Sequence, residues 1–259
     1  MADKLKTQDF SEIYIDYELF LQAKEKIVGK KHNDKGIGTL AEKTVHGVLK
    51  HFFEPEEDNH EVALDGYFAD IYNAAGVVEI QTRNFNRLRE KLAVFLNYYP
   101  VTIVYPLACN KWISWIDPAS GSVSGRRMSP KHYNAYDAFF ELYKIKQFLK
   151  NDNLRIKLVM MDVEEYKLLN GWNATKKKGA ERYDGIPVGI RDIITIDCVE
   201  DYMQFVPYEL KEEFSSAEFA KACKINVETA RLVLNILYYT GTVVRTGKSG
   251  KAYLYKVSE

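Results

Sequence analysis

Cysteine is scarce in this chain, and its few copies are poorly placed for a shared role. The 259 residues include 3 cysteines, which stand far apart and without CxxC spacing: Cys109, Cys198 and Cys223. This spacing argues against a zinc site and against a disulfide framework. We expect all of these side chains to be reduced thiols in the core.

Net charge and long apolar runs are also lacking. The 36 Lys and Arg residues are balanced by 36 Asp and Glu residues, which excludes a uniformly basic, histone-like surface, so any affinity for nucleic acid must come from local patches. No stretch approaches the ~20 apolar residues of a membrane-spanning helix. The N-terminal MADKLKTQDF lacks the apolar region of a signal peptide. We therefore expect a cytoplasmic protein that does not associate with membranes.

The chain does have enough apolar content for a substantial interior. Hydrophobic residues make up 46% of the sequence, which suffices for one large core or two smaller ones. The pattern of elements changes after residue 207. We therefore predict an α/β (α+β) domain over residues 1–207 and a small second domain over residues 208–259.

The segment 61–82, EVALDGYFADIYNAAGVVEIQT, predicts a β-hairpin that sets two carboxylates against each other. If the turn is centred between Ala74 and Ala75, Asp70 lies opposite Glu79 on one face. Gly76 suits the positive φ that a tight connection needs. The other face is apolar and can pack a core, with Ala69, Ile71, Val78 and Ile80.

Two carboxylates placed in this way repel each other, and we expect another group to offset their negative charge. Cross-strand neighbours lie roughly 4.5–5.5 Å apart at Cβ, and like charges there destabilise the sheet. A divalent cation is the usual partner of such a pair. The alternative is a pair of surface acids on a solvated strand face, and the spacing alone leaves that alternative open.

Asp70, followed after eight residues by Glu79-Ile80-Gln81, resembles the active-site signature of the PD-(D/E)XK nuclease superfamily. The resemblance implies that Asp70 and Glu79 bind Mg²⁺ or Mn²⁺, with the main-chain carbonyl of Ile80 completing the metal's shell. Gln81 stands where the family normally has Lys. Some restriction-type members of the family share this departure.

The order of the predicted elements fits the same resemblance. A helix is expected over residues 36–53, and Glu42 in its first turns matches an acid that the family often adds. An amphipathic helix over 86–100 and an apolar strand over 101–108 follow the hairpin. This order, over roughly residues 36–120, implies a restriction-endonuclease-like mixed sheet flanked by helices. The apolar stripe of the first helix comprises Leu40, Val45, Val48, Leu49 and Phe52.

The function that the resemblance implies is Mg²⁺-dependent hydrolysis of DNA phosphodiester bonds by an endodeoxyribonuclease. Asp70 and Glu79 would hold the metal, and Glu42 would assist through water. The metal would polarise the scissile phosphate and activate the attacking water. Gln81 can orient that water but carries no positive charge. We therefore expect slow activity unless Arg83, two residues further if the strand continues, restores the charge.

Residues 109–170 continue the first domain. A hairpin is predicted with its turn over residues 117–121, and a buried strand over 155–163. A helix is predicted over residues 129–150 with Pro130 near its start. Its aromatic residues recur at helical spacing, which indicates core packing and not base stacking: Tyr136, Phe139, Phe140 and Tyr143.

The loop predicted over residues 170–190 is a second candidate for function. Its cations are interleaved with Trp172 and Tyr183, a mixture that can neutralise phosphates and stack on bases. The alternative is a solvated loop with no partner. The cations are Lys176, Lys177, Lys178 and Arg182.

The tail reads as two helices, capped by Ser215 or Ser216 and by Asn226, and then two strands. This order resembles a winged helix-turn-helix domain, in which the second helix enters the major groove and the wing contacts the backbone. Protein contacts are the alternative role. The residues offered to DNA would be Glu228, Thr229 and Arg231 on the helix, and Arg245, Lys248 and Lys251 on the wing.

The rival reading is a catalytically degenerate nuclease fold that serves as a DNA-binding regulator or as a protein-interaction platform. Gln81 favours this rival, whereas the retention of Asp70, Glu79 and Glu42 together favours the enzyme. A weaker reading is an interaction module of a defence or mobile-element system. DNA is the expected partner, and assembly as a homodimer stays open.

Overall fold

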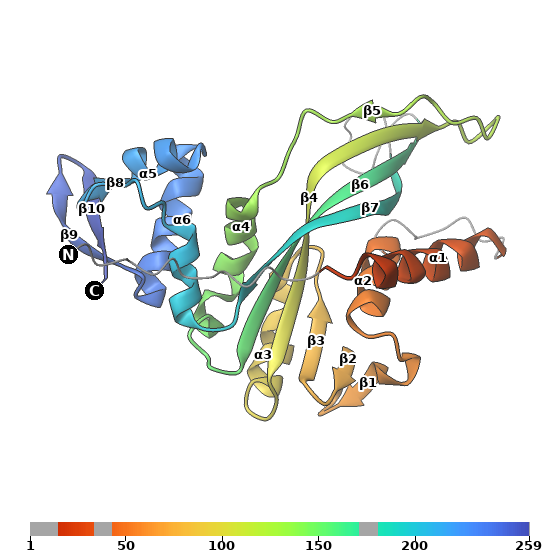
Figure 1. Ribbon diagram of the computed structural model, residues 1–259, viewed down its shortest axis with the longest axis horizontal. Helices are drawn as coiled ribbons and strands as arrows, with labels where there is room; N and C mark the ends of the chain where they lie inside the picture. The colour runs from red at the N-terminus through yellow and green to blue at the C-terminus, as the bar shows by residue number, and fades with distance from the viewer. Residues whose placement is uncertain (1–14, 34–42, 171–180, 259) are drawn as a thin grey trace, which may run out of the picture.

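A mixed seven-stranded sheet forms the centre of the protein, in a computed structural model that describes residues 15–33, 43–170 and 181–258 (Figure 1). Its strand order is β1-β2-β3-β4-β6-β7, and β5 pairs with β4. The pairs β3–β4 and β4–β6 are parallel, and the other pairs are antiparallel. The mixed sheet flanked by helices confirms the predicted α/β class. The first strands are β1 (His60–Leu64), β2 (Tyr67–Asn73), β3 (Gly76–Ile80) and β4 (Val101–Ile116).

The predicted hairpin is present in the predicted register, with the pairs Asn73↔Gly76, Tyr72↔Val77 and Ile71↔Val78. Gly76 has a φ of 114°, and a Cβ at this position would lie 2.3 Å from the carbonyl oxygen of Pro100. Both the backbone conformation and the lack of space therefore require glycine. Because the turn is fixed in this way, β2 and β3 cannot slip past each other. Ile71, Val78 and Ile80 share one hydrophobic cluster, as predicted, but the prediction was wrong for Ala69, which belongs to a second cluster.

Two helices cover one face of the sheet, α1 (Tyr17–Asn33) and α2 (Lys43–Phe53). Of the predicted apolar stripe, Val45, Val48, Leu49 and Phe52 are buried, and Leu40 lies outside the described residues. These side chains share one hydrophobic cluster with Val104 of β4 and Val159 of β6. The helix is thereby held against the middle of the sheet, at the hairpin.

The opposite face is covered by the 3-10 turn η2 (Phe85–Leu88), by α3 (Arg89–Phe95) and by a segment around α4 (Figure 1). Leu92 and Phe95 are fully buried in a second cluster with Ile103 and Ile156. The amphipathic helix predicted here is thus confirmed. Its α-helical part is shorter than the pattern suggested.

The strand β4 is longer than predicted and continues through an irregularity between Ala108 and Asn110. The predicted turn is present, because the Gly121 N–H donates to the Asp117 carbonyl at 2.8 Å. The chain then returns as β5 (Arg127–Met128).

The helix predicted over residues 129–150 is broken and begins later. Asn134 caps it, accepting a hydrogen bond from the Tyr136 N–H at 2.9 Å, so Pro130 lies outside the helix. Phe139 is buried, but Phe140 and Tyr143 are 48% and 46% exposed, so the core assignment was wrong for these two. The pieces are η3 (Ala135–Ala138), α4 (Phe139–Leu142) and η4 (Tyr143–Phe148), which is interrupted at Ile145.

The predicted loop over residues 170–190 is wrong in its second half. Residues 181–190 belong to β7 (Glu181–Ile196), which pairs antiparallel with β6 (Leu154–Leu168), the strand predicted to be buried. The lysine run obscures the start of this strand in the sequence. Residues 171–180 lie outside the described residues.

The tail forms a three-stranded sheet of order β8-β10-β9 with two helices. The predicted caps are present: Ser215 accepts from the Glu218 N–H and Asn226 from the Thr229 N–H. Phe214 and Phe219 belong to the same hydrophobic cluster as Phe139 and Phe205, so residues on both sides of the predicted boundary share one core. The elements are η5 (Val199–Phe205), β8 (Phe214–Ser215), α5 (Ser216–Cys223), α6 (Val227–Thr240), β9 (Val243–Ser249) and β10 (Ala252–Val257).

The cysteines are all free, as predicted, but they are not all in the core. Cys109 and Cys223 are partly buried, whereas Cys198 is exposed, because it occupies the N-cap position where the chain leaves β7 for η5. Within the part of the chain that the structure describes, no helix is long and apolar enough to cross a membrane.

Candidate active site

Four elements bring ionisable side chains to one pocket of about 430 Å³. The helix α2 contributes His46, β2 contributes Asp70, β3 contributes Glu79, and α3 contributes Lys91. We call Asp70 and Glu79 the acid pair and this cavity the acid-pair pocket. The hairpin register predicted from the sequence places the two acids together.

Asp70 lies one residue beyond the last paired position of the hairpin, Ile71↔Val78. There its Oδ2 accepts a hydrogen bond from the Ile80 N–H at 2.7 Å, in the place of a main-chain carbonyl. The Nε2 atom of His46 lies 3.1 Å from the same oxygen. The carboxylate thus holds the end of the hairpin and docks α2 onto it.

Glu79 is 3% exposed, and its carboxylate is paired with the ammonium of Lys91 from α3. The Lys91 ammonium donates to Oε1 at 2.9 Å and to Oε2 at 2.8 Å, and also to the Phe68 carbonyl at 2.6 Å. Lys91 therefore brings to the acid pair a positive charge that Gln81 does not carry.

The two acids have pKa values displaced in opposite directions. Burial, and then the negative charge of Asp70, raise the pKa of Glu79 to about 7, and the attraction of Lys91 offsets only part of this rise. Burial also acts to raise the pKa of Asp70, but the hydrogen bond and charge of His46, together with the Ile80 N–H, lower it overall. Near neutral pH, Asp70 is ionised while Glu79 exchanges a proton. Such divergence is typical of functional carboxylate pairs.

The rim of the acid-pair pocket is cationic. Arg83 and Arg87 line it beside Lys91, and both arginines are exposed. Arginine presents a planar fork of donors that matches the oxygens of a phosphate. The arrangement puts two acids at the base of a pocket whose mouth favours an anion.

Gln81 and Arg83 do not continue the strand as the sequence reading supposed. The Gln81 N–H still donates to the Val104 carbonyl of β4 at 2.9 Å, but β3 ends at Ile80 and Asn84 has a φ of 59°. The Gln81 side-chain amide donates to the Arg83 carbonyl. Arg83 reaches the pocket from this bend and not from the strand face.

Several predicted site residues lie elsewhere. Glu42 and the lysines at 176, 177 and 178 fall outside the described residues. Arg182 is in β7, with its Nε 3.4 Å from Glu165, and lines a neighbouring cavity.

The tail residues that were predicted to contact DNA differ in their exposure. Arg231 is exposed on α6, but Thr229 is buried, and its N–H donates to the capping side chain of Asn226. The Arg245 guanidinium lies 4.0 Å from the ring centre of Tyr253 and 4.5 Å from that of Tyr238. Arg245 is thus held among aromatic rings. On the same sheet, Lys248 lies over Tyr253 and Lys251 is exposed at the tip.

No role was predicted from the sequence for Lys91, Arg87 or His46. Arg87 and Lys91 are four residues apart, the spacing that places two side chains on one face of a helix. That spacing was a usable signal, but nothing in it showed which face meets the hairpin. The contact of His46 with Asp70 depends on how α2 docks, which no local pattern gives.

The described residues offer few side-chain ligands for a metal ion. No group of three or more His, Cys, Asp and Glu side chains in residues 15–33, 43–170 and 181–258 is arranged to hold a metal ion. The acid pair therefore offers at most two protein carboxylates from these residues. Any further ligands would have to be main-chain oxygens, water or a residue outside these ranges.

Comparison with known proteins gives a family without an assigned activity. Residues 43–197, more than half of the chain, match the family described as "Domain of unknown function (DUF8091)". An "Uncharacterized protein" of Treponema pallidum (strain Nichols) is 27% identical over 227 residues, which cover 85% of this chain and 87% of that protein. No solved structure gives a significant match. The family match includes the whole acid-pair pocket.

Proposed function

The chain belongs to the DUF8091 family, and we propose from its site that it is a metal-dependent nuclease that hydrolyses DNA phosphodiester bonds. We assign residues 43–170 and 181–207 to a PD-(D/E)XK-type catalytic domain and the tail to a winged helix-turn-helix domain. The observation that carries the proposal is the acid pair. Two carboxylates, one of them 3% exposed, are held close enough that the charge of Asp70 raises the pKa of Glu79, at the base of a pocket with a cationic rim.

The acid pair fits Mg²⁺ or Mn²⁺ by its chemistry. Mg²⁺ is commonly bound by one or two carboxylates and keeps several waters, so Asp70 and Glu79 suffice as side-chain ligands. The Ile80 N–H faces Asp70, and the carbonyl of Ile80 is the third oxygen that the resemblance suggests. When bound, the metal would polarise the scissile phosphate and lower the pKa of a coordinated water.

The other residues of the pocket have roles that do not depend on the metal. Lys91 holds Glu79 in place and supplies the positive charge that Gln81 lacks. Arg83 and Arg87 bind phosphates at the mouth. His46 orients the Asp70 carboxylate. In the tail, Arg231, Lys248 and Lys251 are exposed and would contact DNA, with Arg245 held ready by its tyrosines.

A second candidate function follows from one specific observation. Lys91 contacts both oxygens of Glu79, and the Ile80 N–H and His46 share one oxygen of Asp70, so protein groups already compensate the acid pair. Such contacts between protein groups and the acid pair are expected in a nuclease fold that has lost its activity. In that case the protein is a DNA-binding regulator or an interaction platform.

Cleavage distinguishes the two candidates. With Mn²⁺ and supercoiled plasmid, the wild type should nick DNA, and Glu79→Gln should lose at least about a hundredfold in rate, because a metal ligand is removed without a change of shape. Gln81→Ala should be only partly impaired, since its amide contacts a loop carbonyl. The matched control is Glu90→Gln, an exposed acid on α3, which should cleave like the wild type.

Two results would count against the nuclease. No cleavage of plasmid, single-stranded DNA or RNA by the wild type would favour the regulator. Equal cleavage by the wild type and by Glu79→Gln would trace the activity to a contaminant.

A further inference from the structure

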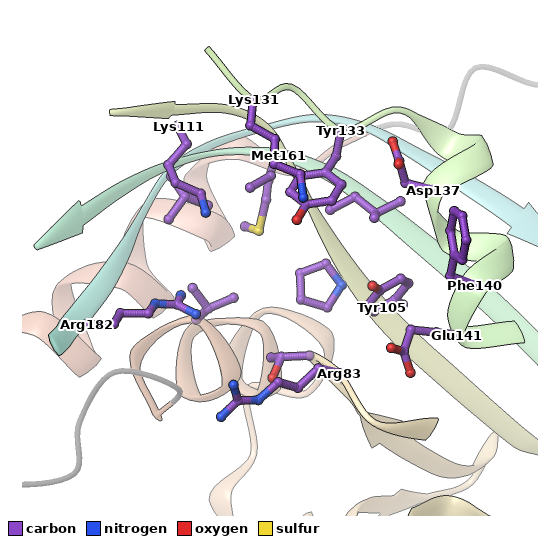
Figure 2. A pocket seen from close by; sticks show the side chains of 16 residues that line it. Arg83, Tyr105, Lys111, Lys131, Tyr133, Asp137, Phe140, Glu141, Met161 and Arg182 are labelled. Carbon is purple, nitrogen blue, oxygen red and sulfur yellow. The ribbon is translucent and has the colours of Figure 1, made fainter. Parts of the chain in front are cut away.

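A second and larger cavity, of about 520 Å³, lies beside the acid-pair pocket. We call it the arch cavity, because it is lined by the long curved strands β4 and β6, by α2 and by the segment 131–141 (Figures 1 and 2). Its volume is within the range of about 300–1,000 Å³ that is usual for small-molecule sites. Thr82 and Arg83 line both cavities, so the two spaces adjoin.

One side of the arch cavity carries an excess of positive charge. Lys111 and Arg182 line it, and both contact Glu165, at 3.1 Å and 3.4 Å. Lys167 lies 3.4 Å from the same carboxylate, so three cations share one acid that is 5% exposed. Figure 2 shows Lys111, Lys131 and Arg182 along one side of the cavity. This side favours an anionic group.

The other side of the lining combines aromatic rings with two acids, Asp137 and Glu141 (Figure 2). Tyr105, Tyr133 and Phe140 line the cavity, and Lys131 lies over the Tyr133 ring at 4.6 Å. Met161 adds an apolar surface between Lys111 and Tyr133 (Figure 2). Phe140 is 48% exposed, although the preceding residue of the same helix, Phe139, is fully buried. Aromatic rings beside cations are the combination that binds bases and phosphates of single strands.

We propose that the arch cavity binds one unpaired nucleotide of the nucleic-acid strand whose backbone reaches the acid pair. The base lies against Tyr133 and Phe140, its phosphate faces Lys111 and Arg182, and Arg83 contacts the adjoining phosphate at the shared wall. This inference rests on the proposed function and names its substrate. A base that is paired and stacked in a duplex cannot present its face to these rings, so the cavity selects single strands or unpaired ends.

Binding in EDTA tests the proposal without cleavage. A fluorescently labelled single-stranded oligodeoxynucleotide is titrated with protein, next to a blunt duplex of the same sequence, and the anisotropy gives both affinities. We expect the single strand to bind more tightly. Phe140→Ala should weaken single-strand binding about 5- to 150-fold, the range for loss of one base–aromatic contact.

Matched variants make the result specific. Tyr143→Ala removes an aromatic ring of nearly equal exposure, 46%, three residues away and outside the cavity lining, and should bind like the wild type. Phe140→Tyr keeps the ring and should also bind like the wild type. Free deoxyadenosine monophosphate should compete with the strand in the wild type and much less in Phe140→Ala, which shows whether the nucleotide alone is recognised.

Each outcome bears on one proposal. Equal affinity for duplex and single strand, or unaltered binding by Phe140→Ala, would overturn the arch-cavity assignment. Phe140-dependent binding without any Mn²⁺-dependent cleavage would sustain the arch cavity and reject the nuclease. Cleavage by wild type together with Phe140-independent binding would do the reverse.

Discussion

Glu79 and Glu165 are two buried glutamates of the same sheet, 3% and 5% exposed, and their pKa values move in opposite directions. Burial acts to raise both. Glu79 has a second carboxylate, Asp70, beside it, and its pKa rises to about 7. Glu165 is surrounded by Lys111, Arg182 and Lys167, and its pKa is lowered. The sign of the neighbouring charge therefore decides the outcome.

The difference separates a carboxylate surrounded by cations from one that faces a second carboxylate. The cations around Glu165 satisfy it and leave positive charge for a ligand. Glu79 keeps a raised pKa in spite of its contact with Lys91, so it binds a proton at a pH where an ordinary glutamate binds none. Groups with such displaced pKa values gather at functional sites.

The largest predicted effect is on the pH dependence of stability through Glu79. Its pKa of about 7 in the folded state exceeds the ordinary value of 4.5, so its stabilising contribution is complete below pH 4.5 and is lost as pH rises to about 7. Each pH unit in this interval costs up to about 1.4 kcal/mol, about 3 kcal/mol in all. Glu79→Gln should therefore gain stability over the wild type across this interval, as measured by urea unfolding.

A constant difference between Glu79→Gln and the wild type from pH 4.5 to 7 would contradict the raised pKa. Glu90→Gln is the control for a carboxylate that is lost from the surface of α3. Its stability should follow the wild type at every pH.

The substitution Glu165→Gln should instead destabilise the folded protein. Removing the acid leaves Lys111, Lys167 and Arg182 close together, which should cost about 2 kcal/mol at pH 7. This is less than the roughly 3–5 kcal/mol for a fully buried pair, because these cations are 22–42% exposed and can turn to solvent. The pKa of Glu165 is lowered in the folded state, so its contribution is present at neutral pH and the penalty shrinks in acid. A penalty that grows in acid would refute the assignment.

Removing one lysine should cost more stability at Glu79 than at Glu165. Lys91→Met removes the ammonium that bridges both oxygens of Glu79, and should cost about 1–2 kcal/mol at pH 8 and less at pH 5, where Glu79 is protonated. Lys111→Met leaves Glu165 with Arg182 and Lys167, so its cost should stay below about 1 kcal/mol. Chemical unfolding of both variants at the two pH values checks this order. Equal costs would remove the contrast between the sites.

The hairpin could be predicted because its determinants are local. Alternation of side chains and Gly76 fix the register, and the register alone brings Asp70 to Glu79. The helix caps at Ser215 and Asn226 are local in the same way. The sequence therefore predicts the acid pair without knowledge of the rest of the fold.

The partners of the acid pair could not be predicted, because they arrive by docking. Lys91 and His46 come from helices on opposite faces of the sheet, and their contacts depend on packing over the whole sheet. The cluster around Glu165 needs β4, β6 and β7 in their observed register, with irregularities in two pairings. The lysines that precede β7 in the sequence also made the start of that strand resemble a loop.

The central claim is that the acid pair binds a divalent cation, and the most direct test is the melting temperature with and without Mn²⁺ at pH 7.5. We predict a saturable rise for the wild type and for Glu165→Gln, because ligand binding to the folded state stabilises it. Asp70→Asn should give no rise, although its shape is conserved. The wild-type response should weaken below pH 7, since a proton on Glu79 competes with the metal. An equal rise in Asp70→Asn, or none in the wild type, would contradict the account.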